Sequence, residues 1–300
     1  MKTKLTLIIT MVCVAALSSI TDAQNRRAGR SAGMSIDTDK LVMSCGDLHV
    51  TYDRRPALTE ETQVTLPASQ TSALQAQTAN SGIFVTGWDR NEYSVTTCKA
   101  VPDDANASAT LRDITTNIAN GQIAVNGPND REWTANLIIM VPRISNLNFR
   151  TNNGPLQLRD LAGSIQLAAT NGPIGLDNVG GVVQATTSNG PISVKNSTGD
   201  QQLTASNGPI SVALSGNHWD GPGLQASTHN GPMSISIPDI YGSGIQIQTS
   251  EHSPLNCTGS ICAGATRSLG SPTVIRFGNA TPTVRLSTMN GPVSIRAGRN

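Results

Sequence analysis

The stretch that decides the fold runs from Thr170 to Val212 and reads TNGPIGLDNVGGVVQATTSNGPISVKNSTGDQQLTASNGPISV. Within it the tripeptide Asn-Gly-Pro returns with an 18-residue period, and an aliphatic–x–aliphatic triplet follows each copy. Self-similarity at a short fixed period is the mark of a repeat architecture. In and beyond this stretch, six copies that precede such a triplet form a corner motif: Asn153, Gly154, Pro155, Asn171, Gly172, Pro173, Asn189, Gly190, Pro191, Asn207, Gly208, Pro209, Asn230, Gly231, Pro232, Asn290, Gly291 and Pro292.

A finer period of nine residues lies inside this longer one. Every ninth residue from Met140 to Val212 is apolar, and apolar residues two apart are typical of a strand with one buried face. Strands at this spacing predict an all-β chain that winds, with each 18-residue turn stacked on the next around one narrow core. The alternative is an antiparallel sandwich, whose hairpin loops would not require a fixed spacing.

The corner motif has a stereochemical reason. Asn tolerates the left-handed backbone region and Gly adopts it without steric cost, while Pro fixes φ at the entry to the next strand. Stacked turns would place the asparagines of successive corners above one another, where their amides form a hydrogen-bonded ladder. We therefore expect a structural role for this row, with recognition of a partner as the alternative.

The N-terminal part predicts export and a separate lobe. Lys2 and Lys4 precede an apolar run that ends near the small residue Ala23, so residues 1–23 read as a signal peptide; an uncleaved anchor is the alternative. Residues 24–40 are polar and predict a flexible mature N-terminus. Residues 41–135 predict a β-rich lobe or cap, and residues 136–300 the repeat domain. No membrane segment is expected after cleavage, and the location would be periplasmic, secreted or on the cell surface.

Four cysteines remain after such cleavage, and an even number in an exported chain indicates disulfides. Four cysteines allow three connectivities. Cys257 and Cys262 lie close together in the sequence and are expected to pair locally, which leaves Cys45 for Cys98. A structural zinc site is the alternative, but the usual CxxC pairs are absent.

The composition and spacing of charged residues argue against several activities. The net charge is +1 with 14% charged residues, which does not favour nucleic acid. Asp160, Asp177 and Asp200 do not follow the 18-residue period and would not share one row, whereas glycoside hydrolysis usually needs two opposed carboxylates. The Gly-Gly-x-Gly-x-Asp repeat of calcium-binding rolls is also missing. We therefore expect no catalytic site, cofactor or metal.

One insertion interrupts the strict spacing, at residues 216–223, and contains His218, Trp219 and Asp220. An insertion in a stack of turns loops out, often on a binding face. Trp219 would then stack on a sugar or peptide, or fold back to cover the side of the stack.

Two features together resemble a known family. One is the segment from Leu74 to Arg90, LQAQTANSGIFVTGWDR, and the other is the repeated Thr/Ser-Asn-Gly-Pro-Ile-Ser-Val. Over roughly residues 70–300 the chain is similar to bacterial β-strand-repeat proteins called "putative adhesins", a family of unknown biochemical role. The resemblance implies an exported, right-handed, single-stranded β-solenoid without assigned catalytic residues.

The function predicted from the sequence is that of an exported, non-catalytic structural or interaction protein. It would be an adhesin that presents a rigid polar surface to a protein or glycan of the cell envelope. One alternative is a carbohydrate-binding or carbohydrate-active β-helix protein that uses the insert at 216–223. A second is an envelope-stress accessory protein.

Overall fold

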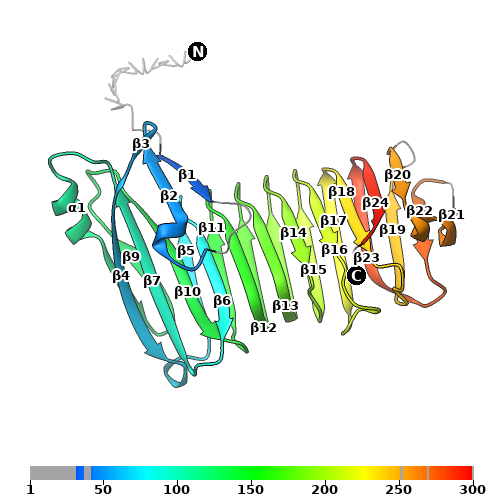
Figure 1. The fold of residues 1–300 in the computed structure, drawn as a ribbon, viewed down its shortest axis with the longest axis horizontal. Helices are drawn as coiled ribbons and strands as arrows, with labels where there is room; N and C mark the ends of the chain where they lie inside the picture. The colour runs from blue at the N-terminus through cyan, green and yellow to red at the C-terminus, as the bar shows by residue number, and fades with distance from the viewer. Residues whose placement is uncertain (1–31, 37–41, 251–252, 269, 299–300) are drawn as a thin grey trace, which may run out of the picture.

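The structure, a computed structural model, describes residues 32–36, 42–250, 253–268 and 270–298. The predicted signal peptide lies outside these residues. The described chain is mostly β, with one α-helix, α1 (Ala107–Asp113). Its strands form a small antiparallel sheet, β1-β2-β3, and one large mixed sheet of 21 strands. Figure 1 shows antiparallel strands at the N-terminal end and a long row of stacked strands beside them.

The N-terminal lobe is built on long antiparallel strands. Strand β7 (Glu92–Val101) lies between β4 (Leu58–Pro67) and β10 (Thr134–Pro142) and pairs antiparallel with both. A second antiparallel pair consists of β8 (Thr115–Ala119) and β9 (Gln122–Asn126). The lobe also contains β5 (Leu74–Thr78), β6 (Ile83–Trp88) and the short helices η1 (Cys45–Asp47) and η2 (Ala68–Gln70).

Strand β10 joins the lobe to the stack. One edge of β10 pairs antiparallel with β7, and the other pairs parallel with β6. Strands β5 and β6 then pair parallel with the first strands of the stack, β11 and β12. The large sheet is therefore continuous across residues 135 and 136, where the sequence predicted a boundary between two domains.

The stack consists of parallel strands whose partners are one 18-residue period apart. Leu156 is opposite Ile174, which is opposite Ile192, and Ile192 is opposite Ile210. The offset is larger where Ile210 meets Met233, because the insertion intervenes. Every pairing of these strands is parallel, so an antiparallel sandwich is excluded here: β11 (Leu147–Thr151), β12 (Leu156–Ala169), β13 (Ile174–Thr187), β14 (Ile192–Lys195), β15 (Asp200–Ala205), β16 (Ile210–Ala213), β17 (Gly223–Asn230) and β18 (Met233–Ile237).

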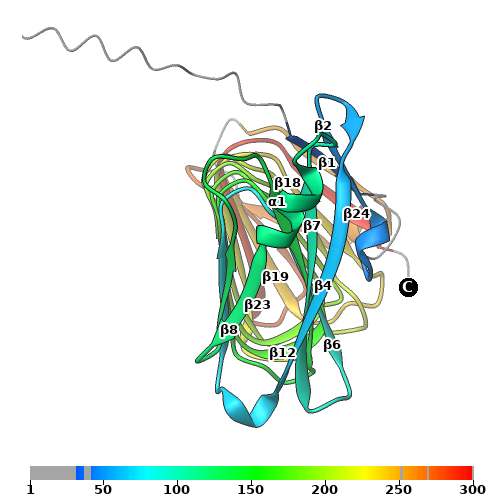
Figure 2. The same cartoon turned by 90° about the vertical axis from the view of Figure 1, so that its left-hand side faces the viewer.

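The apolar residues of the nine-residue period form the core from Phe149 to Val212, as the sequence predicted, whereas Met140 at the start of the series is only half-buried. Figure 2, turned by 90°, shows the strands of successive turns one behind another. Gln201 is a polar residue that is fully buried among these strands. Its side-chain amide donates hydrogen bonds to the carbonyl oxygens of Val179 (2.9 Å) and Thr198 (3.0 Å). The predicted core residues are buried in a single apolar cluster: Leu158, Leu167, Leu176, Val194, Leu203 and Val212.

The C-terminal turn does not lie at the end of the stack. Strand β23 (Pro282–Asn290) pairs in parallel with β17 on one edge and with β19 (Gly244–Thr249) on the other. Strand β24 (Val293–Ala297) likewise lies between β18 and β20 (Leu255–Thr258). In Figure 1 the red C-terminal strands stand between yellow and orange neighbours that precede them in the sequence.

The register explains this order. The complete Asn-Gly-Pro copy at residues 290–292 meets the complete copy at 230–232, with Asn230 opposite Asn290. The degenerate turn at 244–258 takes the outer position, on the far side of the C-terminal turn. Beyond it lie β22 (Thr273–Phe277), which pairs antiparallel with β19, β21 (Thr266–Ser268), and the short helix η3 (Ser260–Gly264).

Part of the predicted flexible N-terminus is ordered. Ala32–Ile36 forms β1, which pairs antiparallel with β2 (Leu48–Tyr52), and β2 pairs with β3 (Arg55–Pro56). The prediction of a flexible segment over residues 24–40 is therefore wrong for these five residues. Backbone pairing and the half-buried Met34 hold a segment whose composition shows no apolar period.

Candidate functional site

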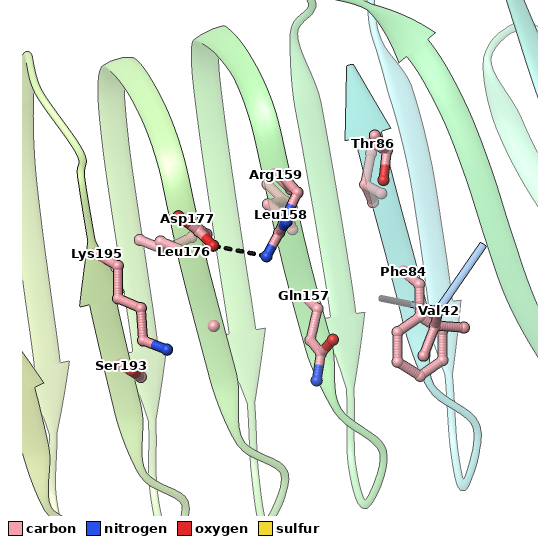
Figure 3. A pocket seen from close by; sticks show the side chains of 12 residues that line it. Val42, Phe84, Thr86, Gln157, Leu158, Arg159, Leu176, Asp177, Ser193 and Lys195 are labelled. Carbon is pink, nitrogen blue, oxygen red and sulfur yellow. Dashed lines mark hydrogen bonds and ion pairs between the residues drawn. The ribbon is translucent and has the colours of Figure 1, made fainter. Parts of the chain in front are cut away.

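An open groove lies where the stack meets the N-terminal lobe (Figure 3). It encloses about 230 Å³ and crosses β6, β12, β13 and β14. Three residues in one row across the strands form its floor, in the order Gln157, Gly175 and Ser193, and Phe84 of β6 lies next to Gln157 at one end of this row. Gly175 leaves a hollow, because a Cβ atom there would have only the Gln157 side chain near it, at 3.6 Å.

A row of alternating charges borders the groove. Arg159 forms an ion pair with Asp177 at 2.6 Å, and the next residue in the register is Lys195. The side chains of Arg159 and Asp177 are 35% and 29% exposed, so their charges mostly offset each other within the protein. Lys195 is exposed and has no carboxylate partner in the described part of the chain. The border of the groove therefore offers one available positive charge.

The opposite wall of the groove is apolar and held by a disulfide. Val42 and Phe84 are buried against each other with Leu48 and Cys98. Cys98 is bonded to Cys45, as expected from the sequence. The groove therefore joins an apolar wall to a cationic border, an arrangement suited to a ligand with both kinds of group.

The corner asparagines form the ladder that the sequence predicted. Asn171 donates its side-chain amide to Asn153 at 2.7 Å, Asn189 donates to Asn171 at 2.8 Å, and Asn207 donates to Asn189 at 3.1 Å. The row continues in both directions through three more asparagines, Asn80, Asn230 and Asn290. Because the amides satisfy one another, this row explains the motif without a ligand.

The expected reason for the corner glycines is wrong. These glycines are not among the residues with positive φ. A Cβ atom on Gly172 would instead fall on the carbonyl oxygen of Gly154, and one on Gly190 would fall on that of Gly172. The motif requires glycine because successive corners approach too closely for any side chain.

Left-handed backbone occurs at the opposite corner of each turn, which the sequence reasoning missed. Asp160, Asn178 and Asn196 have φ values of 56°, 55° and 50°. A glycine with positive φ follows three residues after each, for example Gly181 at 86°. The pattern Asx-x-x-Gly recurs in the sequence with the same 18-residue period, and this recurrence could have predicted the left-handed corner.

The insertion does not present its tryptophan to a ligand. Trp219 is 6% exposed, packs against the main core and donates its indole N–H to the carbonyl oxygen of Gly199 at 2.8 Å. The hypothesis that His218, Trp219 and Asp220 form a ligand site with an exposed tryptophan is therefore wrong for Trp219. Its ring instead covers the side of the stack, which was the alternative. His218 remains exposed and contacts Asn217 at 2.6 Å.

A second disulfide, Cys257–Cys262, lies at the far end of the stack, again as expected. Disulfides persist in oxidising compartments, so the two bonds indicate a location outside the cytoplasm. No helix in the described segments is long and apolar enough to cross a membrane.

The acidic residues do not form an opposed pair where the structure places them. Asp177 is paired with Arg159, and Asp160 accepts a hydrogen bond from Asn178 at 2.7 Å. Asp200 begins β15 on the other side of the turn. Among the described residues, no three His, Cys, Asp or Glu side chains could together hold a metal ion.

The fold and the groove define a disulfide-bonded, mostly β repeat protein with an open groove on its surface. A family described as Toastrack DUF4097 matches residues 34–253. The chain belongs to this family. No curated protein matches it.

Several solved structures are similar at low identity. One is a "putative adhesin" from Bacteroides fragilis, with 10% identity, a TM-score of 0.37, and coverage of 79% of this chain and 97% of that one. Another is a "putative cell adhesion protein" from Clostridium sporogenes, with 9% identity, a TM-score of 0.33, and coverage of 81% and 100%.

Proposed function

We propose that the protein is an exported, non-catalytic interaction protein of the cell envelope, an adhesin that offers a rigid surface to a partner. The observation that carries the proposal is the in-register parallel stack with its satisfied asparagine row. Such a stack holds exposed side chains at fixed spacing, because neighbouring strands lie about 4.8 Å apart. A fixed, repeated surface suits binding rather than a reaction that needs moving parts.

The finer architecture is part of the same proposal. Residues 136–300 wind as a right-handed, single-stranded β-solenoid with 18-residue turns, and the N-terminal lobe caps its open end. The 18-residue register and the two strands in each turn support this winding. The cap removes a free sheet edge, which would otherwise invite aggregation.

The partner binds in the groove beside Gly175. Its apolar wall at Val42 and Phe84 contacts an apolar side chain of the partner, and Lys195 donates to a carboxylate. An extended segment of an envelope protein can present both kinds of side chain.

A pull-down from envelope fractions with the full mature chain tests this proposal. Gly175→Gln fills the hollow with the side chain that occupies the neighbouring turn, and we expect it to abolish capture while leaving the melting temperature unchanged. Ser294→Gln is the matched control, since Ser294 is exposed and lies in the same row beyond the groove. Equal capture by both variants would contradict the proposal.

A further inference from the structure

We propose a second binding site, for an acidic polysaccharide, on the side of the stack that carries a row of glutamines. This row is separated from the groove beside Gly175 by the corner at residues 160–163, and its ligand is independent of that groove. In register, Gln166, Gln184, Gln202 and Gln225 follow one another, and the row continues through Arg285, Gln246 and Arg276.

The glutamines differ from the corner asparagines in their hydrogen bonding. Gln184, Gln202 and Gln225 are exposed, and in the described part of the chain their side chains have no hydrogen-bond partner. An amide has two N–H donors and one acceptor oxygen. The row therefore offers unused donors and acceptors to a ligand rich in hydroxyl groups.

A shallow polar groove of about 270 Å³ lies at the C-terminal end of this row. Arg285 is in the middle of it, with Gln225 and Gln246 on the neighbouring strands to either side. The hydroxyl groups of Thr204, Ser227 and Ser287 line its other border.

The charge of this groove points to an anion. Arg285 and Arg276 are exposed on two strands separated by β19. Neither guanidinium has a carboxylate partner among the residues that the structure describes. Asp200 lies on the same face, at the start of β15, two strands away from β23. An arginine without a partner binds a carboxylate through two parallel hydrogen bonds.

The surrounding chemistry selects a carboxylated sugar polymer rather than a nucleic acid. The groove contains no aromatic side chain on which a base could stack. The chain also has a net charge of only +1, whereas phosphate polymers are held by many cations. Rows that repeat at the strand spacing let one long polymer meet the same amides and hydroxyls turn after turn.

The experiment measures binding of the full mature chain to immobilised polygalacturonate, with its methyl ester as the uncharged counterpart. We expect binding to polygalacturonate and none to the ester. Arg285→Gln extends the amide row and removes one charge, so it should weaken binding roughly tenfold. Arg276→Gln should weaken it less, because Arg276 lies outside the lining of the groove.

The matched control is Arg296→Gln. Arg296 is exposed on β24, on the other side of the stack from the glutamine row, and we expect its replacement to leave binding unchanged. An equal loss with Arg296→Gln would overturn the proposal, because it would reflect net charge alone. Absence of polygalacturonate binding, equal binding of the ester, or tighter binding of single-stranded DNA would also overturn it.

Discussion

Two rows of amide side chains run along the same stack, and they behave differently. The asparagines at the corners hydrogen bond to one another at 2.7–3.1 Å. The glutamines on the flat side share the same register, yet no such bonds join them. The two kinds of residue differ by one methylene group, and they differ in place, because the asparagines lie at tight corners and the glutamines on extended strands. The asparagine row therefore stabilises the structure, whereas the glutamine row is available to a ligand.

The largest expected effect comes from the core on which both rows rest. Leu176 is 2% exposed between the two sides of the stack. Leu176→Ala should lower the free energy of unfolding by about 2–5 kcal/mol through lost burial and the cavity left behind. Chemical denaturation measures this loss. A change below about 1 kcal/mol would contradict the burial of this residue in a packed core.

The second-largest loss of stability is expected from a substitution that disturbs only the corner row. A Cβ atom on Gly190 would fall on the carbonyl oxygen of Gly172, so Gly190→Ala must separate two turns and should cost about 1–3 kcal/mol. Gly175→Ala is the control, because the added methyl group there would have only the Gln157 side chain near it, at 3.6 Å. Similar melting temperatures for the two variants would show that the corners do not approach so closely.

A smaller effect is expected from the asparagine side chains themselves. Asn189 donates to Asn171 and accepts from Asn207, in an exposed position. Asn189→Ala should cost about 1 kcal/mol and leave capture of the envelope partner unchanged. Unchanged melting with lost capture would instead make the corner row the adhesive surface.

The smallest effect is expected on the glutamine row. Gln184 is exposed and makes no side-chain hydrogen bond within the described chain. Gln184→Ala should change the free energy of unfolding by less than about 0.5 kcal/mol. A loss as large as that of Asn189→Ala would remove the distinction between the two rows.

Much of the fold could be predicted from the sequence because its spacing is strict. The nine-residue period identified the buried positions, and the 18-residue period identified the stacked asparagines. Both disulfides also followed from the number and spacing of the cysteines. These features depend on local geometry that repeats from turn to turn.

Other features could not be predicted because they depend on contacts between distant segments. The place of the C-terminal turn between β17 and β19 is set by a match between corners 60 residues apart. The close approach of Gly172 to Gly154 likewise appears only when turns stack. The groove beside Gly175 requires Val42 and Phe84 of the lobe, whose packing has no periodic signal.

Both rows exist only if equivalent residues of successive turns lie one strand spacing apart, and spin labels at exposed positions test this directly. Labels replacing Gln184 and Gln202 would be attached to neighbouring strands, with backbones about 4.8 Å apart. Labels replacing Gln166 and Gln202 would be two spacings apart, about 10 Å. The account predicts strong dipolar broadening for the first pair and weaker broadening for the second. Absence of broadening in both pairs would contradict the stacked turns.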